Sequence, residues 1–153
     1  MKVIIVYETK FGNTKRAAEA IGEGLTEEGH DVVVKYVKDI DGIEAEDFDM
    51  IIIGSPTYAG SHARSIKKFI NKLSNINLEG KSIAAFDTHT SGGDSKFLRK
   101  AVFKMEKQIL KKIPGIKKLI DGLQVGVHGI RGPLVDGELE KCKEFGKNIA
   151  QKT

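Results

Sequence analysis

Five short apolar runs alternate with amphipathic helical patterns along the chain. They are Lys2–Tyr7, Asp31–Val37, Asp49–Gly54, Lys81–Phe86 and Leu123–Val127. This alternation is typical of βαβ units, so it predicts a doubly wound α/β fold with a parallel sheet. Residues 3–6 and 51–53 are continuously apolar, which predicts central strands. Residues 32–36 and 123–127 admit polar or small side chains, which predicts edge strands, and the strand order that fits is 2-1-3-4-5 with helices on both faces.

Apolar residues at helical spacing occupy the segments between and after these runs. The first two stripes are Ala17, Ala18, Ile21 and Leu25, and Ile66, Phe69, Ile70 and Leu73. A third helix is predicted from about Ser95 to Ile113, and a fourth is predicted after Asp136. Cys142 falls on the apolar face of the fourth helix, so we expect it to be a packed thiol.

Length and cysteine content limit the class of protein. The chain has 153 residues, 40% of them hydrophobic, without an internal repeat or linker, so residues 1–153 are predicted to form a single domain. One cysteine permits no internal disulfide, and the first strand is too short for a signal peptide or a membrane span. These features predict a cytoplasmic protein and leave its oligomeric state open.

Charge is distributed unevenly along the sequence. The net charge is +4, but residues 1–54 carry 6 basic and 12 acidic side chains, whereas residues 96–118 carry 9 basic and 1 acidic. Each segment could be a solvated helix face, or the basic segment could dock a partner with an acidic face. No nucleic-acid partner is expected, because no helix-turn-helix, zinc finger or aromatic stacking platform accompanies the lysines.

Three segments that follow predicted strands are expected to meet at one edge of the sheet. They are residues 9–14, 55–60 and 87–94, at the carboxyl ends of strands one, three and four, where a doubly wound sheet binds its ligands. The first segment opens a helix, whose free N–H groups and positive dipole end attract anions. Hydroxyl groups at Thr9 and Thr14, with Gly12 and Asn13 between them, suit a phosphate.

The segment Thr9-Lys10-Phe11-Gly12-Asn13-Thr14 resembles the phosphate loop of the flavodoxin family, and the resemblance extends over essentially the whole chain. It implies a flavodoxin-like five-stranded fold and FMN as the cofactor. The family pattern is a hydroxyl residue, any residue, Thr or Ser, Gly, any residue and Thr. Phe11 takes the place of the middle hydroxyl, as an aromatic residue does in related FMN domains, and we expect Lys10 to replace part of that donor.

The other two segments resemble the loops that hold the flavin ring. In Ser55-Pro56-Thr57-Tyr58-Ala59-Gly60, the resemblance implies that Tyr58 packs against the isoalloxazine ring and that the peptide between Ala59 and Gly60 turns over on reduction. In the third segment, the resemblance implies contacts with the pyrimidine edge from Thr88, His89, Thr90, Ser91, Gly92 and Gly93. No metal site is expected at His89, because no second histidine or cysteine lies at ligand spacing.

Other phosphate-binding classes lack support in the sequence. No Gly-x-Gly-x-x-Gly follows the first strand and no Walker loop occurs. A phospho-receiver domain has acidic residues after strand one, an Asp at the end of strand three and a Lys at the end of strand five, whereas this chain has Tyr7-Glu8, Gly54 and Val127 at these places. The resemblance therefore implies a carrier that shuttles electrons between redox partner proteins, with no catalytic residue. Two alternatives stay open: an FMN-dependent oxidoreductase acting on a quinone or porphyrinogen, and a flavin-free interaction module.

Basic side chains are expected near the ring. Lys10, His62, Arg64 and His89 fall in or beside the three segments, whereas carriers of this family place acidic residues there. A cation a few ångströms from the ring stabilises its reduced anion by about 1 kcal/mol or more at intermediate dielectric. We therefore expect a less negative reduction potential than in the acidic carriers.

Overall fold

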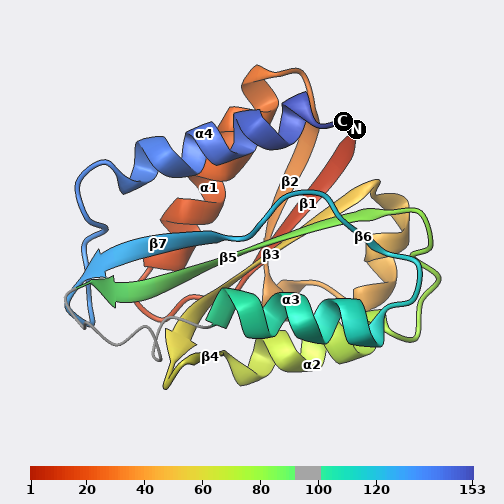
Figure 1. Cartoon of the computed structure of the whole chain (residues 1–153), viewed down its shortest axis with the longest axis horizontal. Coiled ribbons are helices and arrows are strands. Elements are labelled where there is room, and N and C mark those ends of the chain that lie inside the picture. Colours follow the sequence, from red (N-terminus) through yellow and green to blue (C-terminus); the bar gives the residue numbers. More distant parts are fainter. Residues whose placement is uncertain (92–100) are drawn as a thin grey trace.

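The computed structural model describes residues 1–91 and 101–153 (Figure 1). The strands are β1 (Lys2–Tyr7), β2 (Asp31–Tyr36), β3 (Met50–Tyr58), β4 (Ser61–His62), β5 (Ser82–Ser91), β6 (Lys117–Lys118) and β7 (Leu123–His128). The α-helices are α1 (Asn13–Glu27), α2 (Arg64–Leu73), α3 (Ala101–Lys112) and α4 (Glu138–Gln151), and two short 3-10 helices are η1 (Val37–Asp39) and η2 (Gly42–Asp47).

The sheet has the predicted topology. Its strands follow the order β2-β1-β3-β5-β6 and are parallel, and β7 pairs with the part of β5 that follows the part paired with β6. Because β6 and β7 pair with successive parts of β5, they share the fifth position, with β6 an element that the sequence did not predict. The predicted order 2-1-3-4-5 is confirmed.

Helices cover both faces of the sheet and bury two apolar layers. Figure 1 shows α1 and α4 on one face and α2 and α3 on the other. Successive side chains of β1 point to opposite faces, so Val3 and Ile5 pack under α1 and α4, whereas Ile4 and Val6 pack under α2 and α3. Cys142 lies in the first of these layers and is fully buried, as predicted.

Two strands extend beyond their predicted ends. The predicted third strand stopped at Gly54 and the fourth at Phe86, but pairing continues through Ser55 with Asp87 and Pro56 with Thr88. Pairing of β4 with β3 and of β7 with β5 carries the strands to Tyr58 and Ser91. Much of the second and third predicted loops is therefore strand, and the site is built on the sheet itself.

Candidate cofactor-binding site

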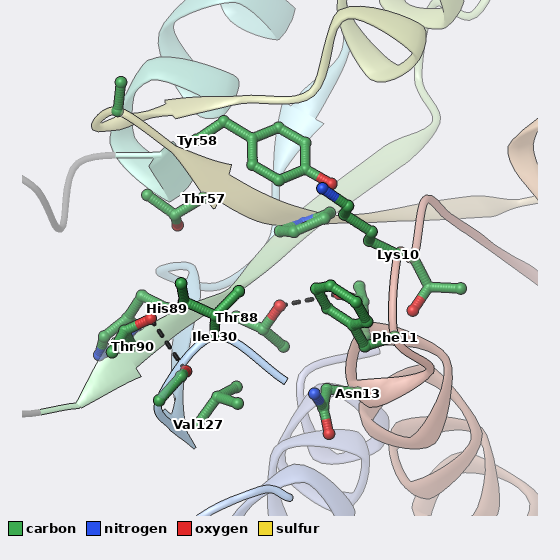
Figure 2. A pocket seen from close by; sticks show the side chains of 15 residues that line it. Lys10, Phe11, Asn13, Thr57, Tyr58, Thr88, His89, Thr90, Val127 and Ile130 are labelled. Carbon is green, nitrogen blue, oxygen red and sulfur yellow. Dashed lines mark hydrogen bonds between the residues drawn. The ribbon is translucent and has the colours of Figure 1, made fainter. Parts of the chain in front are cut away.

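A pocket of about 360 Å³ opens at the carboxyl edge of the sheet (Figure 2). Its lining comes from the segment after β1, from the ends of β3 and β5, and from the end of β7 with the segment that follows it. The lining residues are Thr9, Lys10, Phe11, Asn13, Thr14, Pro56, Thr57, Tyr58, Ala59, Thr88, His89, Thr90, Val127, Gly129 and Ile130. Twelve of these fifteen belong to the predicted set, so the structure brings all three predicted segments together. None of the fifteen is acidic.

The segment between β1 and α1 presents a helix end to the pocket. Gly12 precedes α1 with φ 91°, a left-handed conformation that glycine adopts without steric cost, and its N–H donates to Thr9 Oγ1 at 2.9 Å. No described side chain caps the N-terminus of α1, and its first turn holds no acidic residue. The first-turn N–H groups and the positive end of the dipole are thus available to an anion.

Two side chains of this segment tie it to its neighbours. Thr14 Oγ1 lies 2.8 Å from Thr88 Oγ1 on β5, and both hydroxyl groups are buried. Asn13 Nδ2 donates to the carbonyl oxygen of Arg131 at 3.1 Å, beyond β7. The helix end is therefore held against both β5 and the segment that follows β7.

The turn between β3 and β4 carries the predicted aromatic residue. Tyr58 is 43% exposed, and burial, with a smaller contribution from Glu8, raises the pKa of its phenol. Ala59 and Gly60 follow with φ 50° and 78°, the pair of positive angles that a two-residue type I′ turn requires. Thr57 Oγ1 is buried and has no hydrogen-bond partner among the described residues, which leaves a hydroxyl group for a ligand.

Two predicted residues support this turn without lining the pocket. Ser55 is fully buried; its hydroxyl donates to the carbonyl of Pro56 and accepts the N–H of Ala63, both at 2.8 Å. Gly60 completes the turn and does not line the pocket. Both residues position Tyr58, which is a supporting role.

The end of β5 supplies polar side chains held by a buried acid. Asp87 is fully buried; its Oδ1 lies 3.2 Å from His89 Nδ1, and its Oδ2 accepts the N–H of Val102, near the start of α3, at 3.0 Å. Thr90 Oγ1 donates to the carbonyl of Gly129 at 3.1 Å. Ser91 ends β5, and the predicted residues Gly92 and Gly93 lie outside the described residues.

Sequence reasoning missed the segment after β7. Gly129 and Ile130 line the pocket, and Ile130 is 79% exposed. Arg131 follows with its guanidinium carbon 5.7 Å from the Phe11 ring centre, and Lys10 Nζ lies 5.4 Å from the same centre. The predicted topology could have indicated this segment, because a fifth parallel strand must end at the same edge as strands one, three and four.

The structure places fewer cations at the pocket than the sequence predicted. Lys10 and His89 line it, whereas Arg64 and His62 do not. Arg64 begins α2 and lines a separate depression. His62 is 5% exposed with Nε2 2.6 Å from Gln108 Oε1, and burial lowers the pKa of its imidazole. Neither residue lines the pocket, in contrast to what the sequence predicted for them.

Comparison with known proteins identifies the family. The model of the flavodoxin domain family matches residues 4–122. The chain belongs to the flavodoxin family. It is 33% identical over 156 residues to a flavodoxin of Clostridium saccharobutylicum, with 99% of this chain and 97% of that protein covered. A solved flavodoxin from the domain Archaea matches with a TM-score of 0.81 and 29% identity, covering 99% of this chain and 98% of that one.

A relative with a different activity matches over a similar length. An NAD(P)H dehydrogenase (quinone) of Archaeoglobus fulgidus is 27% identical over 184 residues, with 98% of this chain and 96% of that protein covered. Flavodoxins bind FMN and pass electrons to redox partner proteins, so the predicted cofactor is that of the family. No group of side chains suited to a metal, and no helix able to cross a membrane, occurs within residues 1–91 and 101–153.

This flavodoxin pocket suits an anionic, planar ligand. It combines the uncapped N-terminus of α1 with the hydroxyl group of Thr57, which has no hydrogen-bond partner among the described residues. It also presents the side chains of Tyr58 and Ile130, which are 43% and 79% exposed and come from different elements (Figure 2). With no acidic side chain in the lining, a phosphate group meets no like charge there.

Proposed function

We propose that this pocket holds FMN and that the protein carries electrons between redox proteins through it. The observation that carries the proposal is the combination, in one acid-free cavity, of an uncapped helix N-terminus with an exposed aromatic ring. When bound, FMN supplies the isoalloxazine ring that accepts and releases electrons. The protein contributes binding, orientation and the electrostatic environment of that ring.

The phosphate end is assigned to the segment from Thr9 to Thr14. The first-turn N–H groups of α1 and the hydroxyl of Thr9 would hold the phosphate group, and Lys10 would add charge. Gly12 and Asn13 would fix the backbone, through the left-handed φ and the bond to Arg131. The side chain of Phe11 offers no donor, but its ring centre lies 5.4 Å from Lys10 Nζ and 5.7 Å from the guanidinium carbon of Arg131.

The ring end is assigned to the β3–β4 turn and the end of β5. Tyr58 would pack on one face of the ring, with Pro56, Thr57 and Ala59 beside it and Ser55 and Gly60 in support. The pyrimidine edge would meet Thr88, His89, Thr90, Ser91, Gly92 and Gly93. The positive φ angles on both sides of the Ala59–Gly60 peptide support a turn that can change orientation on reduction.

The partner is assigned by charge. The chain is basic overall, with net charge +4, so we propose redox partners that present an acidic docking face, and we place the protein in the cytoplasm. One cysteine, which is buried, suits a reducing compartment.

FMN binding is tested by titrating the flavin-free protein with FMN and with riboflavin, which lacks the phosphate. FMN should bind at least about 100-fold more tightly, because the phosphate accepts several charge-assisted hydrogen bonds. Tyr58→Ala should weaken both ligands by about tenfold through loss of ring contact. Ile43→Ala, at an exposed apolar residue outside the pocket, is the matched control and should change neither.

Two outcomes would overturn the assignment. Equal affinity for FMN and riboflavin would contradict the assignment of the phosphate to the N-terminus of α1. Absence of binding by either flavin would leave a flavin-free interaction module.

A second function is favoured by the similarity to an NAD(P)H dehydrogenase (quinone). An enzyme of that kind would oxidise NAD(P)H with a quinone in the absence of any partner protein. Steady-state turnover of NADH and NADPH with a soluble quinone separates the two functions, because a carrier gives turnover only when a reductase is added.

A further inference from the structure

A second depression lies beside the pocket, between η1 and α2. We call it the basic groove; its volume is about 440 Å³. Its lining residues are Val37, Lys38, Ile40, Arg64, Ser65, Lys68, Phe69 and Lys72. Three apolar side chains, each less than 10% exposed, form the floor, and four exposed cations form the rim.

The four cations have no partner of opposite charge among the described residues. Lys38, Arg64, Lys68 and Lys72 take part in no ion pair within the part of the chain that the structure describes. Three of them follow one another on α2 at i, i+4 and i+8, a spacing at which like charges repel. In the unbound protein, α2 therefore carries a row of positive charges that repel one another, and an acidic ligand would reduce this repulsion.

Two acidic side chains of neighbouring segments interact with other groups. Neither lines the basic groove. Asp39, next to Lys38 on η1, acts on the phenols of Tyr7 and Tyr36, whose pKa values are raised first by other causes. Glu8 accepts hydrogen bonds from the N–H of Thr9 at 2.9 Å, from Tyr36 and from Ser65.

The basic groove adjoins the proposed FMN site. Ser65, in the groove wall, donates to Glu8 Oε2 at 2.6 Å, and Glu8 is followed by Thr9, which lines the pocket. Arg64 lies close after β4, whose hairpin with β3 carries Tyr58. A molecule seated in the groove would thus lie next to the edge of the pocket.

We propose that the basic groove docks an acidic surface segment of the redox partner protein. This inference rests on the proposed function, because it gives the electron partner its place on the molecule. The groove combines shape, unpaired charge and nearness to the pocket. The exposed lysines of α3 also carry charge, but none of them lines the depression beside that helix, which contains Glu106.

The test uses a fluorescein-labelled oligoglutamate peptide as the probe, with binding to the FMN-loaded protein followed by fluorescence anisotropy. Lys68→Gln/Lys72→Gln removes two rim cations, and Lys107→Gln/Lys111→Gln on α3 makes the same change of charge as the matched control. The groove variant should weaken binding by about five- to tenfold and the control by less than about twofold. Carbodiimide coupling of the wild-type complex should join the peptide to groove lysines.

Three results would overturn the proposal: equal loss in the two variants, greater loss in the α3 variant, or coupling confined to lysines outside the groove. A single-stranded oligothymidylate of matched length provides a further arm. If it binds as tightly as the peptide and loses affinity in the same variant, the groove is a general polyanion surface, and acidic-protein docking is wrong.

Failure of this inference is distinct from failure of the proposed function. FMN affinity is measured on the same three proteins and should be equal in all of them, since the substituted lysines lie outside the pocket. The peptide titration is also run with flavin-free protein. If the wild type does not bind FMN, the cofactor assignment is wrong. If FMN binds but the peptide does not distinguish the groove variant from the control, only the docking site is wrong.

Discussion

The hydrogen bond between Thr14 and Thr88 offers a sharp test of how the helix end is attached to the sheet. The two hydroxyl oxygens are 2.8 Å apart, and the residues are 1% and 4% exposed. They join the first turn of α1 to the end of β5, two of the elements that surround the pocket. Valine matches threonine in shape, so substitution removes the hydroxyl group and leaves the packing nearly unchanged.

The expected energies follow from burial. Thr14→Val leaves the Thr88 hydroxyl buried without its partner, and Thr88→Val does the same to Thr14, so each should lower the free energy of unfolding by about 1–2 kcal/mol. The double variant leaves no unpaired hydroxyl and should lie within about 1 kcal/mol of the wild type. The two effects should therefore be non-additive by at least about 1 kcal/mol.

Urea unfolding of the flavin-free proteins, followed by circular dichroism, measures these energies. Thr26→Val is the control, since it removes an exposed hydroxyl that donates to Gly22 within α1 at 2.8 Å, and it should cost less than about 0.5 kcal/mol. Additive losses in the double variant would refute the reasoning, because they would mean that the two hydroxyl groups do not satisfy each other. FMN titration of the double variant then shows whether the two hydroxyl groups also contact the phosphate or only support the fold.

Three further predictions follow from individual residues. Gly54→Ala should destabilise the protein by about 3 kcal/mol in thermal or urea unfolding, because its Cβ would overlap the Phe86 ring; an unchanged stability would contradict the packing. Hydrogen bonding to Glu8 raises the pKa of Tyr36 from 10.0 to about 12, so its stabilising contribution is complete below pH 10 and is lost as pH rises through about 12. Glu8→Gln should lower that pKa, measured by phenolate absorbance, which no tryptophan obscures. Lys10→Gln should make the reduction potential of the FMN-loaded protein more negative by about 40 mV, equivalent to about 1 kcal/mol at intermediate dielectric.

Arg64→Gln is the control for the Lys10 prediction, and it also shows where sequence reasoning failed. Both residues follow a strand at the carboxyl edge, so the sequence predicts that both lie near the ring. The structure separates them, because Lys10 lines the pocket whereas Arg64 begins α2 and lines the basic groove. An equal shift of potential in the two variants would contradict that separation.

Local pattern was sufficient for the strand order and for most of the pocket. The continuous apolar runs at 3–6 and 51–53 predict central strands because only a strand covered on both faces tolerates them. The ends of β3 and β5 could not be predicted in this way, since polar residues such as Asp87 and Thr88 are held in the strand by pairing with distant segments. The contribution of Ile130 depends likewise on where β7 ends in space.

Glu8 explains how the proposed phosphate site and the basic groove can lie side by side around an acidic residue. Its oxygens receive an N–H from the phosphate segment, a phenol from β2 and a hydroxyl from α2, so donors on three elements surround the carboxylate. Neither the pocket nor the basic groove includes it in the lining. Its negative charge thus fixes the positions of the three elements and is shielded from ligands by the donors that it binds. Because Thr9 and Ser65 share this one carboxylate, a partner that displaces the start of α2 would also disturb the phosphate segment, which ties docking to the cofactor site.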